Sequence, residues 1–501
     1  MEFATVRSRA ECGLQSPPVT VEVHLANGLP AFNMVGMPET AVKESKDRVR
    51  SALVNSHFSF PDRRITVNLA PADLPKTGSR FDLPIALGIL AASGQLPAET
   101  LQKRECFGEL ALDGGIRAVR GLLPGVLAAA ADGMAAVIPA DEHNLGVLAS
   151  RAKLEPATNL LNLCASLKGL APFAPLKRTQ TSVLNTAASD MADVVGQAVA
   201  KRALEIAAAG RHNVLFFGPP GTGKSMLASR LPGLLSPPSE EDYLTSIALH
   251  DLAQMTPTRP GLPPFRSPHH SASAAALVGG GAVPRPGEAS LAHGGVLFLD
   301  ELPEFQRPVL EALREPMENG EITVSRARFK FRFPARFQLV AAMNPCPCGY
   351  AGDEERHCRC TPEQVARYQQ RVSGPLLDRI DLHVGVTRPP AQQLLTTQSQ
   401  AESSAEVKAR VDSALAHQLA RQGSPNAQLT PDALLQHCQL LTSDAQWLQS
   451  AADSLALSGR ALHRTLRVAR TIADLAGADS VERSQLAEAL SYRRAPAEPH
   501  R

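Results

Sequence analysis

The chain has 501 residues, of which 44% are hydrophobic and 20% are charged, so a disordered chain is excluded. This length predicts two to four domains, because a single hydrophobic core rarely serves so long a chain. Lys and Arg together number 51 and Asp and Glu 49, so any contact with nucleic acid must come from a local basic patch.

The start of the chain, Met1–Thr5, lacks the basic region and apolar stretch of a signal peptide. No apolar run reaches the roughly 20 residues that span a bilayer. We therefore expect a cytoplasmic protein without a membrane partner. Four cysteines are scattered, and we expect them to be free thiols in a reducing compartment: Cys12, Cys106, Cys164 and Cys438.

Residues 1–168 predict an α+β or α/β domain with its own core, because short strand patterns alternate with helical ones. Val19–Leu25 and Arg64–Ala70 read as strands. Leu83–Ala92 and Gly121–Ala131 are apolar stretches of helical length.

Four further segments follow along the chain. Residues 169–190 are polar and contain prolines, which favours an exposed linker. Residues 191–390 predict an α/β domain with a parallel sheet, because its strands are apolar on both faces. A connecting helix is expected within 391–425, and a small helical domain over 426–495, where apolar residues recur at helical spacing.

The second domain contains the pattern G-x-x-x-x-G-K-S, which is typical of a phosphate-binding P-loop. The pattern follows the apolar strand Asn213–Phe217 and precedes a helix, whose N-terminus favours negative charge. Lys224 is expected to reach the β- and γ-phosphates of ATP, and Ser225 to bind Mg²⁺. The loop glycines let backbone N–H groups turn toward the phosphates. The remaining cofactor-binding residues are Gly218, Pro219, Pro220, Gly221, Thr222 and Gly223.

Two more strands end in polar side chains, where ligands of a parallel sheet bind. Residues 296–299 are followed by Asp300, expected to hold Mg²⁺ through water, and Glu301, expected to orient or deprotonate the attacking water. Residues 337–343 are followed by Asn344. Its amide could contact the γ-phosphate or the water; the alternative is an amide that caps a turn.

Charge in a transition state also requires cations, and two arginines are candidates. Arg379 precedes the strand at 382–386, and Arg460 begins a helix over 460–476. The chain has 51 basic residues, so physical reasoning alone does not select these two, and each could be an ordinary surface or ion-paired arginine.

Residues 325–334 read S-R-A-R-F-K-F-R-F-P, which predicts a strand with cations on one face and phenylalanines on the other. Residues 318–321 are expected to form the hairpin turn and 322–324 the partner strand. A row of cations suits the phosphates of single-stranded DNA, and a solvated charged face is the alternative. The expected DNA contacts are Arg326, Arg328, Lys330 and Arg332.

The glycine-rich stretch 265–286, which contains His269 and His270, is expected to be a flexible loop and a second candidate for DNA contact. Metal binding by these histidines is disfavoured, because adjacent side chains rarely face one ion.

Four cysteines form the pattern C-x-C-x9-C-x-C within 15 residues. Their thiolates could complete a tetrahedral Zn²⁺ site, and Pro347 and Gly349 favour a turn that directs the sulfurs inward. Free thiols or a redox pair are the alternatives, and His357 could replace one thiolate. The expected ligands of a structural, non-catalytic Zn²⁺ are Cys346, Cys348, Cys358 and Cys360.

Taken together, the chain resembles the magnesium-chelatase-like AAA+ ATPase family and, within it, the ComM (YifB) group. The resemblance covers essentially the whole chain and is carried by VGQ at 195–197, HNVLFFGPPGTGKSMLA, FRSPHHSAS, PRPGEASLAHGGVLFLDELPEF, AAMNPCPCGY and SGRALHRTLRVARTIADLAG. It implies an AAA+ core with a helical lid. It further implies that Asn344 is the first sensor, Arg379 a finger acting on a neighbouring subunit, and Arg460 the second sensor.

Proteins of this group act as hexameric helicases that drive branch migration during natural transformation. The resemblance therefore implies a hexameric ATPase that uses ATP and Mg²⁺ and translocates on DNA. The alternative is a protein-remodelling or magnesium-chelatase-type motor without DNA activity. A non-catalytic ATP-binding scaffold is disfavoured by the intact Lys224, Asp300 and Glu301.

The first domain resembles the Lon-protease fold through Pro75–Asp82 and Gly108–Gly115. When these segments are aligned, the nucleophile position falls on Arg80 and the catalytic lysine position on Leu123. A Ser–Lys pair needs both groups, so we expect no proteolysis, although Ser79 is one residue away. The domain is then a scaffold or a DNA-contacting collar.

Overall fold

The computed structural model describes residues 2–36, 42, 44–74, 76–142, 148, 151–176, 190–255, 262–281, 284–325, 330–353, 355–389 and 401–493. Its contacts group the chain into two compact units. Unit 1 contains Met1–Val183 together with Ile247–Pro257 and Ser325–Phe333, and unit 2 contains the rest. Two short segments of the expected ATPase region thus belong, by their contacts, to the N-terminal unit.

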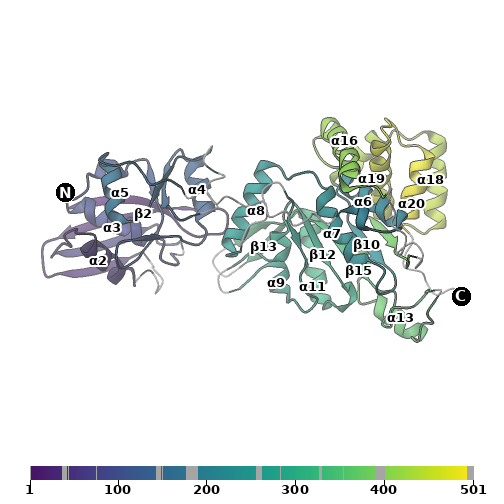
Figure 1. Ribbon diagram of the computed structural model, residues 1–501, viewed down its shortest axis with the longest axis horizontal. Coiled ribbons are helices and arrows are strands. Elements are labelled where there is room, and N and C mark those ends of the chain that lie inside the picture. Colours follow the sequence, from purple (N-terminus) through teal and green to yellow (C-terminus); the bar gives the residue numbers. More distant parts are fainter. Residues whose placement is uncertain are drawn as a thin grey trace. The chain divides into compact units, whose positions relative to one another are not determined.

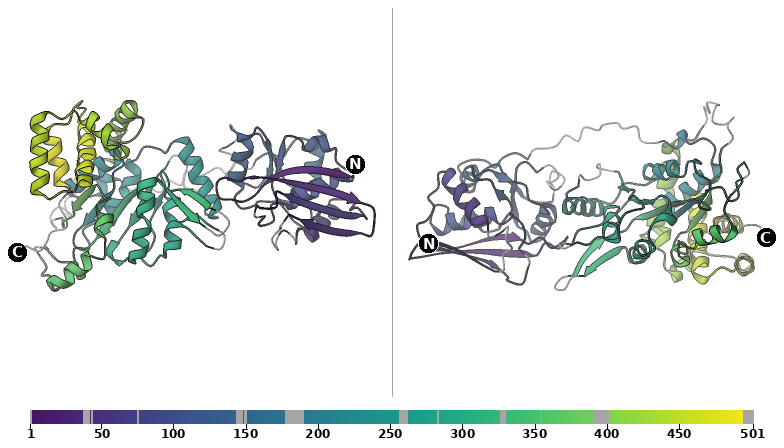
Figure 2. Two further views of the ribbon diagram at one scale, coloured as in Figure 1. Left: turned by 180° about the vertical axis from the view of Figure 1, so that it is seen from behind. Right: turned by 90° about the horizontal axis from the view of Figure 1, so that it is seen from below.

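Unit 1 is built on a seven-stranded mixed sheet with the order β3-β4-β2-β1-β5-β8-β9. The pairs β1–β2 and β2–β4 are antiparallel, and the other neighbours are parallel. Figure 2 shows the purple strands as one layer with helices on one side. The strands are β1 (Phe3–Arg9), β2 (Pro18–Ala26), β3 (Ala31–Val35), β4 (Arg64–Ala70), β5 (Arg104–Cys106), β8 (Ala135–Pro139) and β9 (Leu154–Ala157).

The predicted mixture of helices and strands and all four elements predicted for this region are confirmed, since Val19–Leu25 lies in β2, Arg64–Ala70 is β4, and the two apolar stretches are α3 and α4. Every residue of α3 is buried, which explains why its sequence shows no polar face. The helices are α2 (Ser45–Asn55), α3 (Asp82–Ala92), η1 (Ala98–Leu101), α4 (Leu122–Ala131) and α5 (Leu160–Leu167), and a small sheet is formed by β6 (Glu109–Leu110) and β7 (Ile116–Arg117).

The position aligned with a protease nucleophile holds a structural arginine. The buried Arg80 guanidinium donates to the carbonyl oxygens of Arg9 at 3.1 Å and Gly121 at 3.2 Å. Leu123 is buried in α4. These two side chains serve the packing of unit 1.

Unit 2 is built on a five-stranded parallel sheet with the order β11-β12-β15-β10-β16. Val214 and Phe216 face one hydrophobic cluster and Leu215 the other, so helices cover both faces, and β10 and β12 are apolar throughout (Figure 1). The strands are β10 (Val214–Phe217), β11 (Phe265–Arg266), β12 (Val296–Leu299), β15 (Gln338–Met343) and β16 (Leu382–Gly385).

In residues 190–389, helices alternate along the chain with the strands of the sheet, as is typical of an α/β domain. They are η3 (Met191–Asp193), α6 (Ala198–Gly210), α7 (Lys224–Leu234), α8 (Glu240–Leu252), α9 (Ala274–Val278), α10 (Glu288–Leu291), η4 (Leu302–Glu304), α11 (Arg307–Ala312), α12 (Arg314–Asn319), α13 (Pro362–Gln369) and α14 (Gly374–Leu377).

The C-terminal helices share one hydrophobic cluster with the sheet, so the expected boundary near residue 390 does not separate two cores. Val407 and Val411 of α16 join the same cluster as Val214, and α16 and α19 both pack against α6. These helices are α16 (Ser404–Gln422), η5 (Asn426–Gln428), α17 (Pro431–Cys438), α18 (Thr442–Ser454), α19 (Gly459–Leu475) and α20 (Arg483–Ser491). No helix among the described residues is long and apolar enough to cross a bilayer.

The expected hairpin turn at 318–321 was wrong. Residues up to Asn319 belong to α12, and Gly320 ends that helix with a φ of +68°, a left-handed conformation that glycine adopts easily. The hairpin is instead formed by β13 (Glu321–Ser325) and β14 (Lys330–Pro334). The expected DNA contacts Arg326 and Arg328 lie outside the described residues.

The predicted alternation is confirmed in β14. Lys330 and Arg332 are exposed, whereas Phe331 and Phe333 are buried. A Cβ added to Gly13 would lie 3.4 Å from the Phe331 ring and 3.6 Å from the Phe333 ring, so within unit 1 these rings pack against Gly13. Lys330 and Arg332 therefore form an exposed cationic face of β14, and Phe331 and Phe333 form the opposite face, which is packed against Gly13.

We predict that Gly88→Ala destabilises unit 1. The new Cβ would lie 2.5 Å from the Val23 side chain, inside a fully buried helix. Overpacking of this kind costs roughly 1–3 kcal/mol, so hydrogen exchange of peptides from β1 and β2 should accelerate by about 5- to 150-fold. Gly233→Ala in α7 is the control, because its Cβ would meet no atom within 4 Å. Equal exchange in both variants would contradict this account of the core.

Candidate functional site

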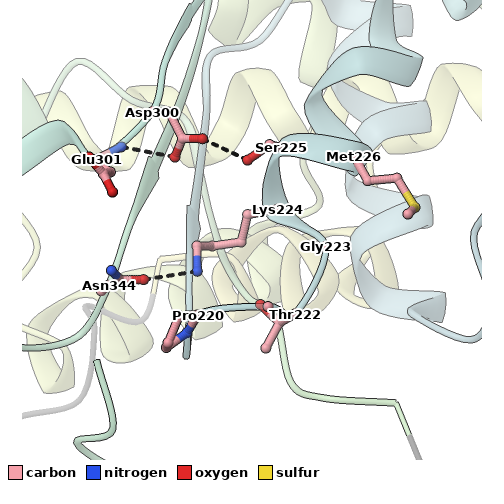
Figure 3. Close-up of a pocket in the computed structure, with 10 residues that line it drawn as sticks. Pro220, Thr222, Gly223, Lys224, Ser225, Met226, Asp300, Glu301 and Asn344 are labelled. Carbon is pink, nitrogen blue, oxygen red and sulfur yellow. Dashed lines mark hydrogen bonds between the residues drawn. The ribbon is translucent and has the colours of Figure 1, made fainter. Parts of the chain in front are cut away.

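A pocket of about 390 Å³ opens where β10, β12 and β15 end (Figure 3). The three strands are adjacent and parallel, so their carboxyl ends meet at one edge of the sheet. The segment that follows each strand contributes to the lining: Pro220, Gly221, Thr222, Gly223, Lys224, Ser225, Met226, Asp300, Glu301 and Asn344.

The loop after β10 has an open inner side. Gly221 and Gly223 have φ values of +76° and +91°, and a Cβ at either position would meet no atom within 4 Å. The helix α7 begins directly at Lys224, so its first backbone N–H groups lack partners within the helix. On the outer side, a Cβ at Gly218 would lie 2.1 Å from the Val386 carbonyl oxygen. The loop is thus packed closely against Val386, and the first backbone N–H groups of α7 are free of partners within the helix. This arrangement suits phosphate binding.

Lys224 is buried, and its ammonium donates to three neutral oxygens. Its Nζ lies 2.8 Å from the carbonyl oxygens of Gly218 and Pro219 and 3.1 Å from Oδ1 of Asn344. Burial lowers the pKa of Lys224, and the Asp300 carboxylate opposes this effect. Phosphate oxygens would offer the ammonium charged acceptors, which form stronger hydrogen bonds.

Ser225 and Asp300 form the pair that could share a magnesium ion. The Ser225 hydroxyl donates to Oδ2 of Asp300 at 2.6 Å, and Oδ1 of Asp300 accepts from the Glu301 N–H at 2.9 Å. Hydroxyl and carboxylate oxygens are ligands that Mg²⁺ prefers, and this is the pair that holds it in P-loop enzymes. The residues present therefore fit a magnesium nucleotide.

Glu301 has a φ of +52°, in the left-handed region that residues other than glycine adopt infrequently. Its Oε2 lies 3.1 Å from Nδ1 of His270. The centroid of the His270 ring in turn lies 4.0 Å from the centroid of the His269 ring. The sequence assigned His270 to a flexible loop and missed this contact.

That expected loop is partly regular. It contains β11, which pairs with β12, and α9, whose Leu277 is buried in the sheet's second hydrophobic cluster. The pairing with β12 is what brings His270 close to Glu301, and nothing in the local sequence signals it.

Gln197 also supports the loop, and the sequence did not predict it as a site residue. Its side-chain amide donates to the Thr387 carbonyl oxygen at 2.5 Å and lies 3.4 Å from that of Thr222. The Thr222 hydroxyl donates to the Pro219 carbonyl oxygen at 3.0 Å.

Arg379 and Arg460 do not line the pocket. They meet at another place in unit 2, where both guanidinium groups donate to Oε1 of Glu318, Arg379 at 2.5 Å. The side chain of Arg379 is only 5% exposed, and it also donates to the Pro375 carbonyl oxygen at 2.6 Å. Burial lowers the pKa of Arg379, as does the nearby Arg460 cation. The roles expected for these arginines stay predictions.

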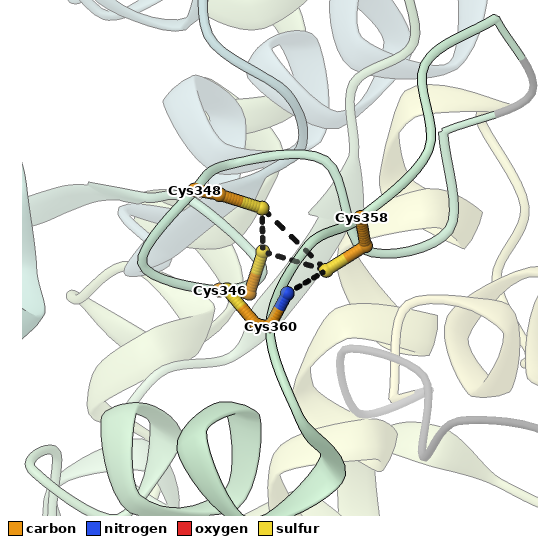
Figure 4. A group of neighbouring side chains, drawn as sticks. All are labelled: Cys346, Cys348, Cys358 and Cys360. Carbon is orange, nitrogen blue, oxygen red and sulfur yellow. Dashed lines mark hydrogen bonds between the residues drawn. The ribbon is translucent and has the colours of Figure 1, made fainter.

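The four clustered cysteines lie together after β15, as expected (Figure 4). Their Sγ atoms are all within 4.8 Å of one another. His357 is exposed and does not belong to the group. The four sulfurs thus form a possible metal site beside the pocket.

Family models for the magnesium chelatase subunit ChlI match three segments of the chain. The model of the subunit itself matches residues 190–394, a second model of the subunit matches 21–143, and the C-terminal model matches 401–493. The matches include every residue of the pocket and the arginines at 379 and 460.

Relatives are similar over the whole length. The protein YifB of Salmonella typhimurium is 52% identical over 501 residues, covering 98% of this chain and 97% of that protein. The competence protein ComM of Haemophilus influenzae is 50% identical over 500 residues, covering 98% of each. The magnesium-chelatase 38 kDa subunit of Rhodobacter capsulatus is 31% identical over 172 residues, or 30% of this chain and 49% of that subunit.

We predict that His270→Ala lowers the kcat for ATP turnover by roughly three- to tenfold and leaves KM unchanged, because His270 contacts the Glu301 carboxylate, which is the expected base for the attacking water. His417→Ala, at an exposed histidine of α16, is the control. Equal kcat values for the two variants would show that the Glu301 contact has no catalytic effect.

Proposed function

The chain belongs to the magnesium-chelatase-like family and its ComM (YifB) group, and we propose that it is a hexameric AAA+ ATPase that translocates on DNA and promotes branch migration during natural transformation. One observation carries the ATPase assignment. One pocket is lined by five of the predicted side chains: Lys224, the hydrogen-bonded pair Ser225 and Asp300, Glu301, and Asn344. The DNA assignment is supported by the competence relative and by the cationic face of β14.

In the proposed reaction, the backbone of the 218–223 loop and Lys224 hold the nucleotide phosphates. Ser225 and Asp300 would hold Mg²⁺, which would supply positive charge to the phosphates. Glu301 orients the attacking water and accepts its proton, while His270 restrains the Glu301 carboxylate. Asn344, already bonded to Lys224, contacts the γ-phosphate or the water.

Arg379 is proposed to complete the site of a neighbouring subunit, and Arg460 to respond to the nucleotide from the lid. Both are bound to Glu318 in the single chain, so Arg379 must leave this carboxylate to reach another subunit. A monomer would then hydrolyse ATP slowly, which is the physical reason for a ring.

Unit 1 is proposed to be a Lon-like scaffold or collar without proteolytic activity. The protein is proposed to act in the cytoplasm, where incoming DNA recombines.

We predict that Arg379→Ala abolishes turnover and preserves ATP binding, whereas Lys224→Ala removes binding. Neither variant alone should be active. Mixed rings would restore turnover, because an intact loop meets an intact arginine at about a quarter of the interfaces in a random one-to-one mixture. Absence of any recovery in rings that have demonstrably mixed would refute action between subunits.

DNA should stimulate ATP turnover by the assembled protein. Steady-state ATPase assays with single-stranded and branched DNA test this, with Lys224→Ala as the inactive control. If DNA neither binds nor changes turnover in an assembled ring, the magnesium-chelatase-type or protein-remodelling motor becomes the better assignment.

The double variant Lys330→Ala/Arg332→Ala tests the β14 face. We expect weaker binding of single-stranded DNA and a salt dependence, log K against log salt, that is shallower by about 1.4, because two phosphate contacts are lost. Lys153→Ala/Lys168→Ala removes the same charge elsewhere on unit 1 and should leave both values unchanged. Equal slopes for the two double variants would exclude β14 as the contact.

A further inference from the structure

The cysteine cluster has the dimensions of a site for one metal ion. Sγ of Cys346 lies 3.3 Å from that of Cys348 and 3.6 Å from that of Cys358, and the last two sulfurs are 3.5 Å apart. Cys360 completes the group within 4.8 Å. Four thiolates bound to one Zn²⁺ at about 2.3 Å have sulfur–sulfur distances of about 3.8 Å, close to these values.

The same distances argue against the alternatives. A disulfide bond is about 2.05 Å long, and all four residues are free cysteines. An iron–sulfur cluster needs room between its cysteine ligands for several iron and sulfide atoms, and this sulfur cage is too small for them. A single ion that prefers four thiolates in a tetrahedron, as Zn²⁺ does, fits the cage.

The backbone around the sulfurs suits thiolates. The Ala351 N–H donates to Sγ of Cys346 at 3.3 Å, and the Cys360 N–H donates to Sγ of Cys358 at 3.4 Å. Such donors stabilise negative charge on sulfur and orient metal-binding thiolates. Cys346 is fully buried, so a charge on its sulfur would otherwise lack solvent.

The cluster also contacts the nucleotide loop directly. Gly349, which lies in the turn between the two cysteine pairs, has a φ of +86° and packs on Pro220. A Cβ at Gly349 would lie 2.7 Å from Cδ of Pro220. On the other side, Cys346 follows Asn344 by two residues, and Asn344 accepts from Lys224 at 3.1 Å. The segment 346–349 therefore contacts the 218–223 loop through Gly349 and is connected through the chain to Asn344.

We propose that the four cysteines hold one Zn²⁺ and that this ion fixes the Gly349 turn against Pro220, so that metal occupancy sets the affinity of the 218–225 loop for nucleotide. Without the ion, four thiolates would repel one another or change position, and the Gly349 turn would no longer be held in place. The part concerning affinity rests on the proposed nucleotide binding, whereas the metal site does not.

Three variants of the full-length protein separate these statements. Wild type, purified without chelator, should contain about one zinc per chain by elemental analysis. Cys348→Ser should lose the zinc and bind a fluorescent ATP analogue roughly tenfold more weakly. Gly349→Ala retains all four cysteines and should keep its zinc, yet it should bind the analogue more weakly because its Cβ displaces Pro220. Cys12→Ser, at a partly exposed cysteine outside the group, should match wild type in both measurements.

The outcomes are distinguishable. If wild type contains no zinc and takes up none from equimolar Zn²⁺ under reducing conditions, the metal site is refuted. If zinc is present but Cys348→Ser and Gly349→Ala both bind nucleotide as wild type does, the metal site stands and the control of affinity is refuted. If wild type binds zinc but no nucleotide, the proposed function fails while the metal site remains. Circular dichroism of Cys348→Ser shows whether a loss of affinity reflects general unfolding. In that case the affinity of wild type for the analogue, measured after zinc is removed by a chelator and again after zinc is restored, decides the question.

Discussion

Two hydrogen bonds in unit 2 join the segments that follow three strands of its parallel sheet. Lys224 donates to Asn344 and Ser225 donates to Asp300, so the segment after β10 is joined to those after β15 and β12. This is possible only because the three strands are parallel and adjacent, which brings their carboxyl ends to one edge. The helices on both faces, and the apolar strands that they cover, serve to keep this edge fixed.

The helical C-terminal region depends on the same sheet. Asp381, directly before β16, accepts from Arg464 of α19 at 2.6 Å and from the Asn213 N–H before β10 at 2.9 Å. Since α16 and α19 also pack against α6, the helices are connected to the sheet through both a polar link and a common apolar cluster. The helices are thus fixed to the amino ends of β10 and β16, at the edge of the sheet opposite the pocket.

The sequence predicted those parts of the fold and site that depend on local chemistry. The 218–225 loop, Asp300–Glu301 and Asn344 were found because each directly follows a short apolar strand. The turn at 318–321 was wrong because Asn-Gly ends helices as readily as it forms hairpins, and the preceding helix decided between them. The contacts of His270 with Glu301 and of Gly349 with Pro220 were missed, since they join segments that only the folded sheet brings together.

The place where Arg379 and Arg460 share Glu318 has a charge imbalance. Two guanidinium groups, one of them almost fully buried, face a single carboxylate, so the group of three carries one positive charge in excess. Such a triad is electrostatically incomplete, and the species that would complete it is a second anion. The folded chain thus holds an excess of positive charge at a place that does not line its own pocket, and this excess favours the approach of an anion.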